Sequence, residues 1–322
     1  MKISKITFFI IGVALFALLL YKANIKEISA NLKIIGYNIY IPFCISMTGY
    51  FFHALAWHKI FYQIEKTVKL FFLFKIKLIG ETINSLIPLG MGAGDPFRAL
   101  SLRTFFPMVK ITASIIIERT IYFFVSIISI YIGIFILFIR IKVPSEIKSI
   151  LIMVLVGISV LFLLLFIKQR KNFLSSLLHF IEKTKLFPIK KYWKEKAEEV
   201  DKTIYTYYKE HKKIFLITNV YTFLGRLGGT LEIYMIMVLL NLKGSFVDAF
   251  LIHAVTQIVN LAFSIVPATL GVMEGAYGLI FHLLGHDATD GITLQIVRRV
   301  RVFMMIFVGL LLSLTMKKKK HT

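Results

Sequence analysis

The chain has 322 residues, of which 57% are hydrophobic and 17% charged, and its formal net charge is +22. A water-soluble globule of this size cannot bury so much apolar surface in one core, so the composition predicts a polytopic membrane protein. The single cysteine, Cys44, excludes a disulfide scaffold and zinc sites built on paired cysteines. Lysines and arginines lie mostly between apolar runs, which favours membrane orientation and anionic lipid headgroups over nucleic-acid binding.

Six apolar runs are long enough to cross a bilayer as helices, since a span needs about 20 residues. They cover residues 6–21, 34–57, 111–139, 150–167, 214–240 and 292–315. The first run follows two lysines, as a signal peptide would, but no small-x-small cleavage site follows it. We therefore expect an uncleaved first helix.

Two further apolar stretches are interrupted and do not fit a simple crossing. Residues 71–95 are broken at Pro88 and by a glycine cluster, and residues 246–285 are broken at Pro267 and near Gly271. Irregular backbone at membrane depth is tolerated only where protein or a wet cavity surrounds it. We therefore expect two re-entrant helical hairpins, in an all-α polytopic fold with about six full spans.

The distribution of basic residues predicts the orientation. With the amino terminus inside and each hairpin returning to its own side, most of the 39 lysines and arginines fall in cytoplasmic segments. The positive-inside rule then predicts a multi-pass protein of the cell membrane with both termini cytoplasmic. The hairpins enter from opposite sides, which suggests an inverted-topology repeat whose hairpin tips meet near the midplane and form the substrate site.

We expect one transmembrane domain over residues 1–322, in which residues 168–213 form the only sizeable polar segment, between the two halves. Phe173, Leu177 and Ile181 recur there at helical spacing. This pattern predicts an amphipathic helix on the inner leaflet. The segment is too short to form a catalytic domain of its own.

Ionised side chains inside apolar segments are costly, so they mark candidate functional residues. The alternative interpretation is internal ion pairing that fixes the bundle, because opposite charges can pair across helices. His253 is expected to be a hydrogen-bonded core histidine. The charged residues in these segments are Glu81, Asp95, Arg98, Glu118, Arg119, Arg226, Glu232, Glu274, Arg298, Arg299 and Arg301.

The stretch from Glu81 to Arg98 is the richest in candidate chemistry. Pro88 ends a helix, and the glycines that follow it free backbone amides to bind an anionic oxygen. Arg98 offers a planar fork suited to phosphate. Glu274 lies one turn into the helix after the second break, where the helix dipole favours a carboxylate that could pair with an arginine or carry a proton.

One set of motifs resembles the flippase-like family, also called the lysylphosphatidylglycerol synthase transmembrane-region family. It runs Glu81–Asn84–Pro88–Gly92–Gly94–Asp95–Arg98, then Glu118-Arg119, then Pro267 and Gly271-Val-Met-Glu274-Gly275. The best-known member is the multiple peptide resistance factor, whose membrane part moves aminoacylated phospholipid across the bilayer. The resemblance covers nearly the whole chain. It implies functional positions at Glu81, Asn84, Asp95, Arg98, Glu118, Arg119, Glu274 and Arg298, to which we add Arg226 as a substrate-binding candidate.

The resemblance implies translocation of an anionic or phosphate-bearing lipid, with the headgroup held by Arg98, Arg119, Arg226 or Arg298. We expect a transporter rather than an enzyme, with no cofactor or metal, and with membrane lipids rather than nucleic acid as partners. No Walker-type nucleotide motif is present, so ATP is not expected to drive it. The lipid, the direction of transport and the oligomeric state stay open.

Two alternatives stay open beside translocation. One is a membrane-embedded lipid-modifying transferase, and the other is a membrane subunit of a phospholipid aminoacyl synthase whose soluble enzyme is encoded separately. The aminoacyltransferase domain of the full-length factor does not follow Lys320, and Thr269-Leu270-Gly271 stands where the family usually has a double glycine. Lipid aminoacylation by this chain alone is therefore not expected.

Overall fold

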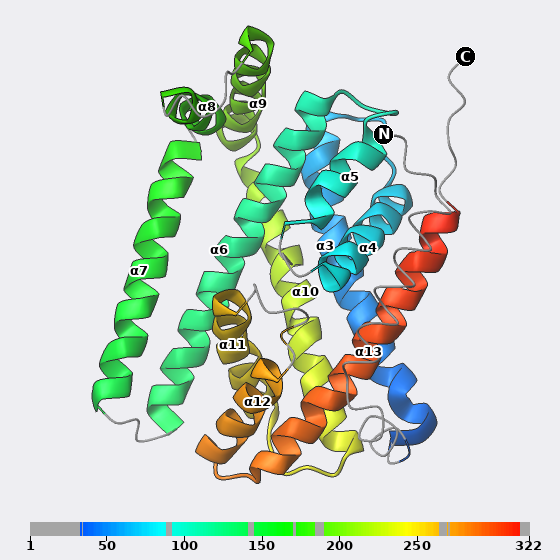
Figure 1. Ribbon diagram of the computed structural model, residues 1–322, viewed down its shortest axis with the longest axis vertical. Helices are drawn as coiled ribbons and strands as arrows, with labels where there is room; N and C mark the ends of the chain where they lie inside the picture. The colour runs from blue at the N-terminus through cyan, green and yellow to red at the C-terminus, as the bar shows by residue number, and fades with distance from the viewer. Residues whose placement is uncertain are drawn as a thin grey trace.

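The computed structural model describes residues 33, 35–87, 92–140, 145–169, 172–183, 190–263, 269 and 271–315. Within these ranges the chain forms eleven α-helices and a short 3-10 helix, Gly36–Ile39, and contains no strand (Figure 1). The predicted all-helical class is therefore confirmed for the described residues. The span expected at residues 6–21 lies outside them.

Among the described residues, four helical segments are long and apolar enough to cross a membrane: Gly36–Ile64, Met108–Arg140, Leu151–Gln169 and Lys212–Leu239. They belong to α3 (Tyr40–Ile64), α6 (Met108–Arg140), α7 (Ser145–Gln169) and α10 (Lys212–Leu239). The runs predicted at residues 34–57, 111–139, 150–167 and 214–240 fall on these four helices. The runs predict these helices because each run is an apolar stretch close to the length of a bilayer core.

The last predicted span corresponds to α13 (Ala288–Leu314), a helix of 27 residues. At 1.5 Å per residue it is about 40 Å long, enough to cross a bilayer. Its middle carries Arg298, Arg299 and Arg301. These three arginines make it less apolar than the other four helices.

The two interrupted stretches each form a pair of short helices. The first pair is α4 (Leu70–Leu86) and α5 (Gly94–Leu102), and the second is α11 (Phe246–Ala262) and α12 (Val272–Leu283). The helices of each pair pack against each other. The first pair lies in the upper half of Figure 1 and the second in the lower half.

The two halves of the chain interlock. Helix α3 packs against α10 along the centre of the molecule, α6 packs on α11, and α13 packs on α4. The seam between α3 and α10 is narrow because Gly49 faces Gly225 and Gly228, and a Cβ at Gly49 would lie 3.0 Å from the carbonyl oxygen of Gly225. Small residues of this kind let membrane helices approach closely. Any space at the centre is therefore bounded by both halves.

The polar segment forms two helices, α8 (Phe173–Lys183) and α9 (Lys191–Glu210), at the upper end of the molecule beside α7 (Figure 1). Phe173, Leu177 and Ile181, whose spacing predicted a helix, lie on α8, so that helix is confirmed. The backbone N–H groups of Leu174 and Ser175 donate to Asp201 of α9, at 3.0 and 2.9 Å. The free N–H groups at the start of α8 are thus satisfied by a carboxylate, which ties the two helices together.

The hairpin of α4 and α5 depends on a close backbone approach, which yields a first prediction. A Cβ on Gly94 would lie 2.2 Å from the carbonyl oxygen of Gly80, whereas a Cβ on Gly92 would have nothing within 4 Å. We expect Gly94→Ala to destabilise the protein by about 1–3 kcal/mol, the usual effect of overpacking. Gly92→Ala is the matched control and should leave the midpoint of thermal unfolding in detergent unchanged; equal midpoints for both variants would contradict the contact.

Candidate functional site

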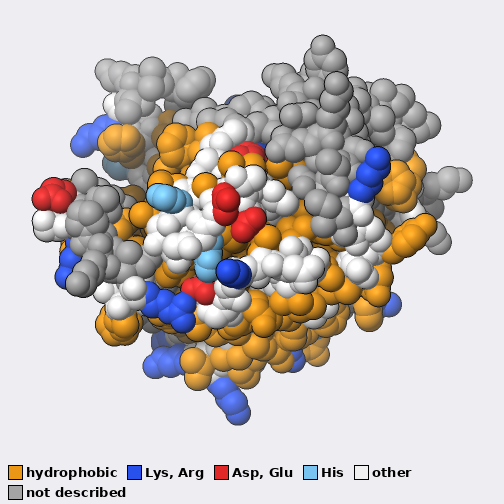
Figure 2. Space-filling model, turned by 90° about the horizontal axis from the view of Figure 1, so that it is seen from below, with side chains coloured by type: hydrophobic (Ala, Val, Ile, Leu, Met, Phe, Trp, Pro, Cys, Tyr) orange, Lys and Arg blue, Asp and Glu red, His pale blue; other side chains and the backbone are white. Residues whose placement is uncertain are grey.

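A polar cavity of about 290 Å³ lies at the centre of the helical bundle, between the two halves. Its wall is formed by α3, α4, α6, α10, α11 and α13. In the lower face of the molecule, acidic, basic and histidine side chains gather in a polar area flanked by hydrophobic side chains (Figure 2). The charged residues that line the cavity are Lys77, Glu81, Arg119, Arg226, Glu232, Arg298 and Arg301.

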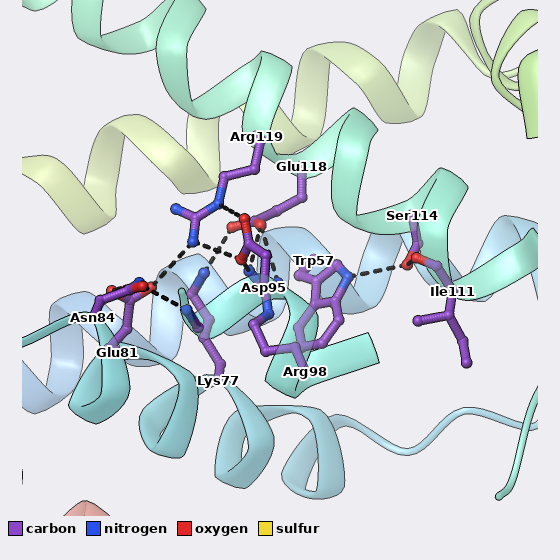
Figure 3. Close-up of polar contacts among 11 residues, drawn as sticks. Trp57, Lys77, Glu81, Asn84, Asp95, Arg98, Ile111, Ser114, Glu118 and Arg119 are labelled. Carbon is purple, nitrogen blue, oxygen red and sulfur yellow. Dashed lines mark hydrogen bonds and ion pairs between the residues drawn. The ribbon is translucent and has the colours of Figure 1, made fainter. Parts of the chain in front are cut away.

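Behind the side of the cavity that α4 and α6 form, Glu118 of α6 holds α4 and α5 in place. Its carboxylate accepts a hydrogen bond from Lys77 of α4 at 2.6 Å and two from Arg98 of α5 at 3.0 Å (Figure 3). All three side chains are at most 5% exposed. The guanidinium of Arg98 also lies over the ring of Trp57, 3.9 Å from its centroid. Burial of these charges is tolerable because each is paired and hydrogen-bonded.

A second set of contacts fixes the tip of the same hairpin. Asp95, in the first turn of α5, accepts two hydrogen bonds of 2.7 Å from Arg119 and one of 2.9 Å from Arg98. Asn84, near the end of α4, accepts from the backbone N–H of Gly94 at 2.7 Å and donates to Glu81 at 3.2 Å. The carboxylate of Glu81 faces the cavity, and the nearest guanidinium, that of Arg119, lies 3.9 Å away.

The second hairpin carries a matching ion pair. Glu274, in the first turn of α12, accepts from Arg299 of α13 at 2.8 Å and from the backbone N–H of Gly271 at 2.8 Å. In both hairpins, then, an acid at the start of the second helix pairs with an arginine of a long helix, Asp95 with Arg119 and Glu274 with Arg299. These pairs are partly exposed, unlike the buried contacts of Glu118.

On the opposite wall, Glu232 of α10 binds two arginines of α13. Its Oε1 accepts from Arg298 at 3.0 Å and from Arg301 at 2.8 and 3.0 Å, and its Oε2 accepts from Ser46 of α3 at 2.8 Å. Arg298 also donates to the hydroxyl of Tyr277. One carboxylate therefore serves two guanidiniums here, which leaves this wall positively charged.

Arg226 of α10 has no carboxylate partner among the described residues. Its guanidinium donates to Gln257 of α11 and Ser126 of α6 and lies over the ring of Tyr122, 4.4 Å from the centroid. Neutral acceptors and an aromatic face hold the side chain without cancelling its charge. This arginine adds to the positive charge of the wall formed by Glu232, Arg298 and Arg301.

The residues selected from the sequence occupy three places. Glu81, Arg119, Arg226 and Arg298 line the cavity; Asn84, Asp95, Arg98 and Glu118 form the contacts behind its first wall; and Glu274 lies at the other hairpin. His253, expected in the core, lines the cavity and is bonded to Thr230 at 3.0 Å.

Three further residues line the cavity and were not among the candidates expected from the sequence: Tyr50, His53 and Lys77. Lys77 precedes Glu81 by four residues and so shares its helix face, a spacing that could have identified it. Glu232 and Arg301 stood among the charged residues but were not chosen as site residues. No three His, Cys, Asp or Glu side chains come together as a metal site in the part of the chain that the structure describes. The cavity has the chemistry of an anion-binding site.

Comparison with known proteins gives one match. The family model described as "Lysylphosphatidylglycerol synthase TM region" matches residues 6–309. No match to the chain was found among curated proteins or among solved structures.

The buried contacts of Glu118 yield a second prediction. Glu118→Gln leaves the Lys77 ammonium buried without a carboxylate in contact, while Arg98 keeps Asp95. Breaking a buried pair in this way costs about 3–5 kcal/mol. We expect a loss of stability of that size, measured as the free energy of unfolding in detergent.

Glu65→Gln is the control for this variant, because it also removes a carboxylate from a lysine. Glu65 follows the end of α3 and accepts from Lys110 at 3.0 Å, and this hydrogen bond keeps the pKa of the Glu65 carboxyl below its usual value. The Lys110 side chain is 41% exposed. We expect a loss of no more than about 1 kcal/mol. Equal losses for the two variants would show that Glu118 does not hold a buried network.

Proposed function

Because the chain belongs to the lysylphosphatidylglycerol synthase transmembrane-region family, we propose that it moves a lipid with an anionic, phosphate-bearing headgroup across the cell membrane. The family match and the apolar helices make the chain a multi-pass membrane protein linked to lipid handling. We propose translocation of the lipid and not its synthesis. It rests on one observation, the cationic cavity at the centre of the bundle.

The charge of the cavity supports an anionic headgroup. Lys77, Arg119, Arg226, Arg298 and Arg301 line it against two carboxylates. Arginine forks bind phosphate oxygens through charge-assisted hydrogen bonds, which strengthen where the local dielectric constant is low. A polar cavity inside apolar helices offers a headgroup a path that the hydrocarbon core of the bilayer does not.

The arrangement of the hairpins supports alternating access. In our proposal α4 with α5 and α11 with α12 are re-entrant hairpins of an inverted repeat, entering from opposite sides of the membrane, with both termini cytoplasmic. In such transporters the repeats rock about a fixed central site. The partly exposed pairs Asp95–Arg119 and Glu274–Arg299 are then the contacts that open and close, one at each hairpin. The buried contacts of Glu118 stay intact.

An apolar groove supports a lipid, as opposed to a soluble anion. The groove has a volume of about 300 Å³ and is lined by Ile45, Phe52 and Leu231, among others, on the face of α3 and α10 that points away from the polar cavity. Gly49 borders both spaces. We propose that the hydrocarbon tail lies in this groove while the headgroup occupies the cavity.

Reconstituted vesicles test the proposal. The purified chain is incorporated into vesicles with a headgroup-labelled anionic phospholipid, and a membrane-impermeant quencher reports the labelled fraction in the outer leaflet over time. We expect faster exchange than in vesicles without protein. Arg301→Gln should slow exchange about tenfold or more, the effect of losing one charge-assisted contact to phosphate.

Arg103→Gln is the matched control, since Arg103 is exposed and does not line the cavity. It should exchange lipid at the wild-type rate. Unchanged leaflet distribution across a panel of anionic lipids would overturn the proposal. Conversion of the lipid into a new product, detected by mass spectrometry of the same vesicles, would indicate a lipid-modifying transferase instead.

A further inference from the structure

We propose that the central cavity selects a lipid whose headgroup ends in a phosphomonoester, which carries close to two negative charges at neutral pH. This inference rests on the proposed function and names the substrate class of the same cavity. It is carried by the distribution of charge between the two walls of the cavity.

The wall formed by α4, α5 and α6 is electrically balanced. It holds as many carboxylates as cations, and each cation is within 4 Å of at least one of the carboxylates. This wall therefore carries no excess charge for a ligand to neutralise. Its members are the cations Lys77, Arg98 and Arg119 and the carboxylates Glu81, Asp95 and Glu118.

The wall formed by α10 and α13 is not balanced. Arg298 and Arg301 share the single carboxylate of Glu232, and Arg226 has none in contact among the described residues. Apart from Glu27, every Asp and Glu of the chain lies in the described part. Three guanidiniums against one carboxylate leave an excess of two positive charges. A ligand with two negative charges neutralises this wall.

Two buried donors without an acceptor lie beside this wall, on the two side chains of the Arg226–Gln257 hydrogen bond. Arg226 Nε and Gln257 Nε2 are buried and have no hydrogen-bond partner among the described residues. A buried N–H group without an acceptor is unfavourable, and native structures rarely keep one. Both groups are donors, so an added acceptor on this side, as opposed to an added cation, would satisfy them.

The shape of the site fits a terminal phosphate. A phosphomonoester presents three terminal oxygens, and three guanidinium forks reach the same cavity, two of them held by the aromatic faces of Tyr122 and Tyr277. A phosphodiester headgroup has only two free oxygens and one charge. A zwitterionic headgroup has no net charge. The cavity should therefore rank lipids in that order.

The first experiment compares lipids and pH. The exchange assay is run from pH 5 to pH 8 with phosphatidic acid, a long-chain prenyl phosphate, phosphatidylglycerol and phosphatidylcholine, followed by chemical analysis of each leaflet. We expect both phosphomonoesters to exchange at least about tenfold faster than phosphatidylglycerol at pH 8, which is the effect of one additional charge-assisted hydrogen bond. Their rates should fall as pH drops through about 6, where the phosphate gains its second proton.

Phosphatidylglycerol controls for titration of the protein, because its phosphate has no second ionisation near neutral pH. The other titratable groups that line the cavity are Tyr50 and His53 of α3, Glu81 of α4, Tyr122 of α6, Glu232 of α10 and His253 of α11. A change in the protonation of these groups would alter the exchange rates of phosphatidylglycerol and of the phosphomonoesters alike. Only the phosphomonoesters should show the fall near pH 6; a parallel fall for phosphatidylglycerol would overturn the proposal.

The second experiment supplies the missing carboxylate. Gln257→Glu keeps the size of the side chain and places a negative charge in contact with Arg226. The added ion pair should leave the midpoint of thermal unfolding unchanged or raise it, while the preference for phosphomonoesters falls about tenfold. A variant that keeps the full preference would show that the charge of Arg226 does not select the lipid.

Gln63→Glu is the matched control, since Gln63 accepts from Lys66 at 3.4 Å and does not line the cavity. It makes the same chemical change beside a cation elsewhere and should leave the preference intact. The experiments distinguish failure of the phosphomonoester assignment from failure of the proposed translocation. Equal exchange of all anionic lipids overturns the phosphomonoester assignment and leaves translocation standing, whereas no exchange of any lipid overturns both.

Discussion

The pairing of buried charge is the constraint on which the structure depends. In apolar surroundings a guanidinium or ammonium is costly unless carboxylates or other hydrogen-bond acceptors satisfy it. Glu118 does this for Lys77 and Arg98 at once, and so joins the three helices α4, α5 and α6 through one side chain. The short helix α5, which has only nine residues, is held further by the pair Asp95–Arg119 and by the hydrogen bond from Gly94 to Asn84.

The same constraint explains where the molecule can act. Charges that are fully paired build the fold, and charges that lack a partner are free to bind something else. The pairs of Glu118 are buried, those at the two hairpin tips are partly exposed, and Arg226 faces the cavity with only neutral acceptors. The charged residues thus form three groups: pairs that fix the fold, pairs that we propose to open and close, and an arginine that we propose to bind the ligand. On our proposal that ligand is a phosphate headgroup.

The interlocked packing of the two halves gives the cavity its composition. Because α13 packs on α4 and α6 packs on α11, neither half encloses the space alone. One half supplies a balanced wall and the other a positively charged wall, so the asymmetry of charge lies across the interface between them. Relative motion of the halves would therefore change access to the site and the distance between its walls together, which is what alternating access around a central site requires.

The sequence by itself determined the helical class, four apolar spans, the two broken stretches and the presence of costly charges within them. These features are local, because length, hydropathy and helix breakers act over one or two turns. It did not determine which charges pair. Lys77 was not among the candidate residues, and Glu232 was named only as one of the charged residues, yet both line the cavity. Pairing depends on which helix faces meet across the bundle, and only the tertiary structure brings residues such as Arg226 and Gln257, 31 positions apart, into contact.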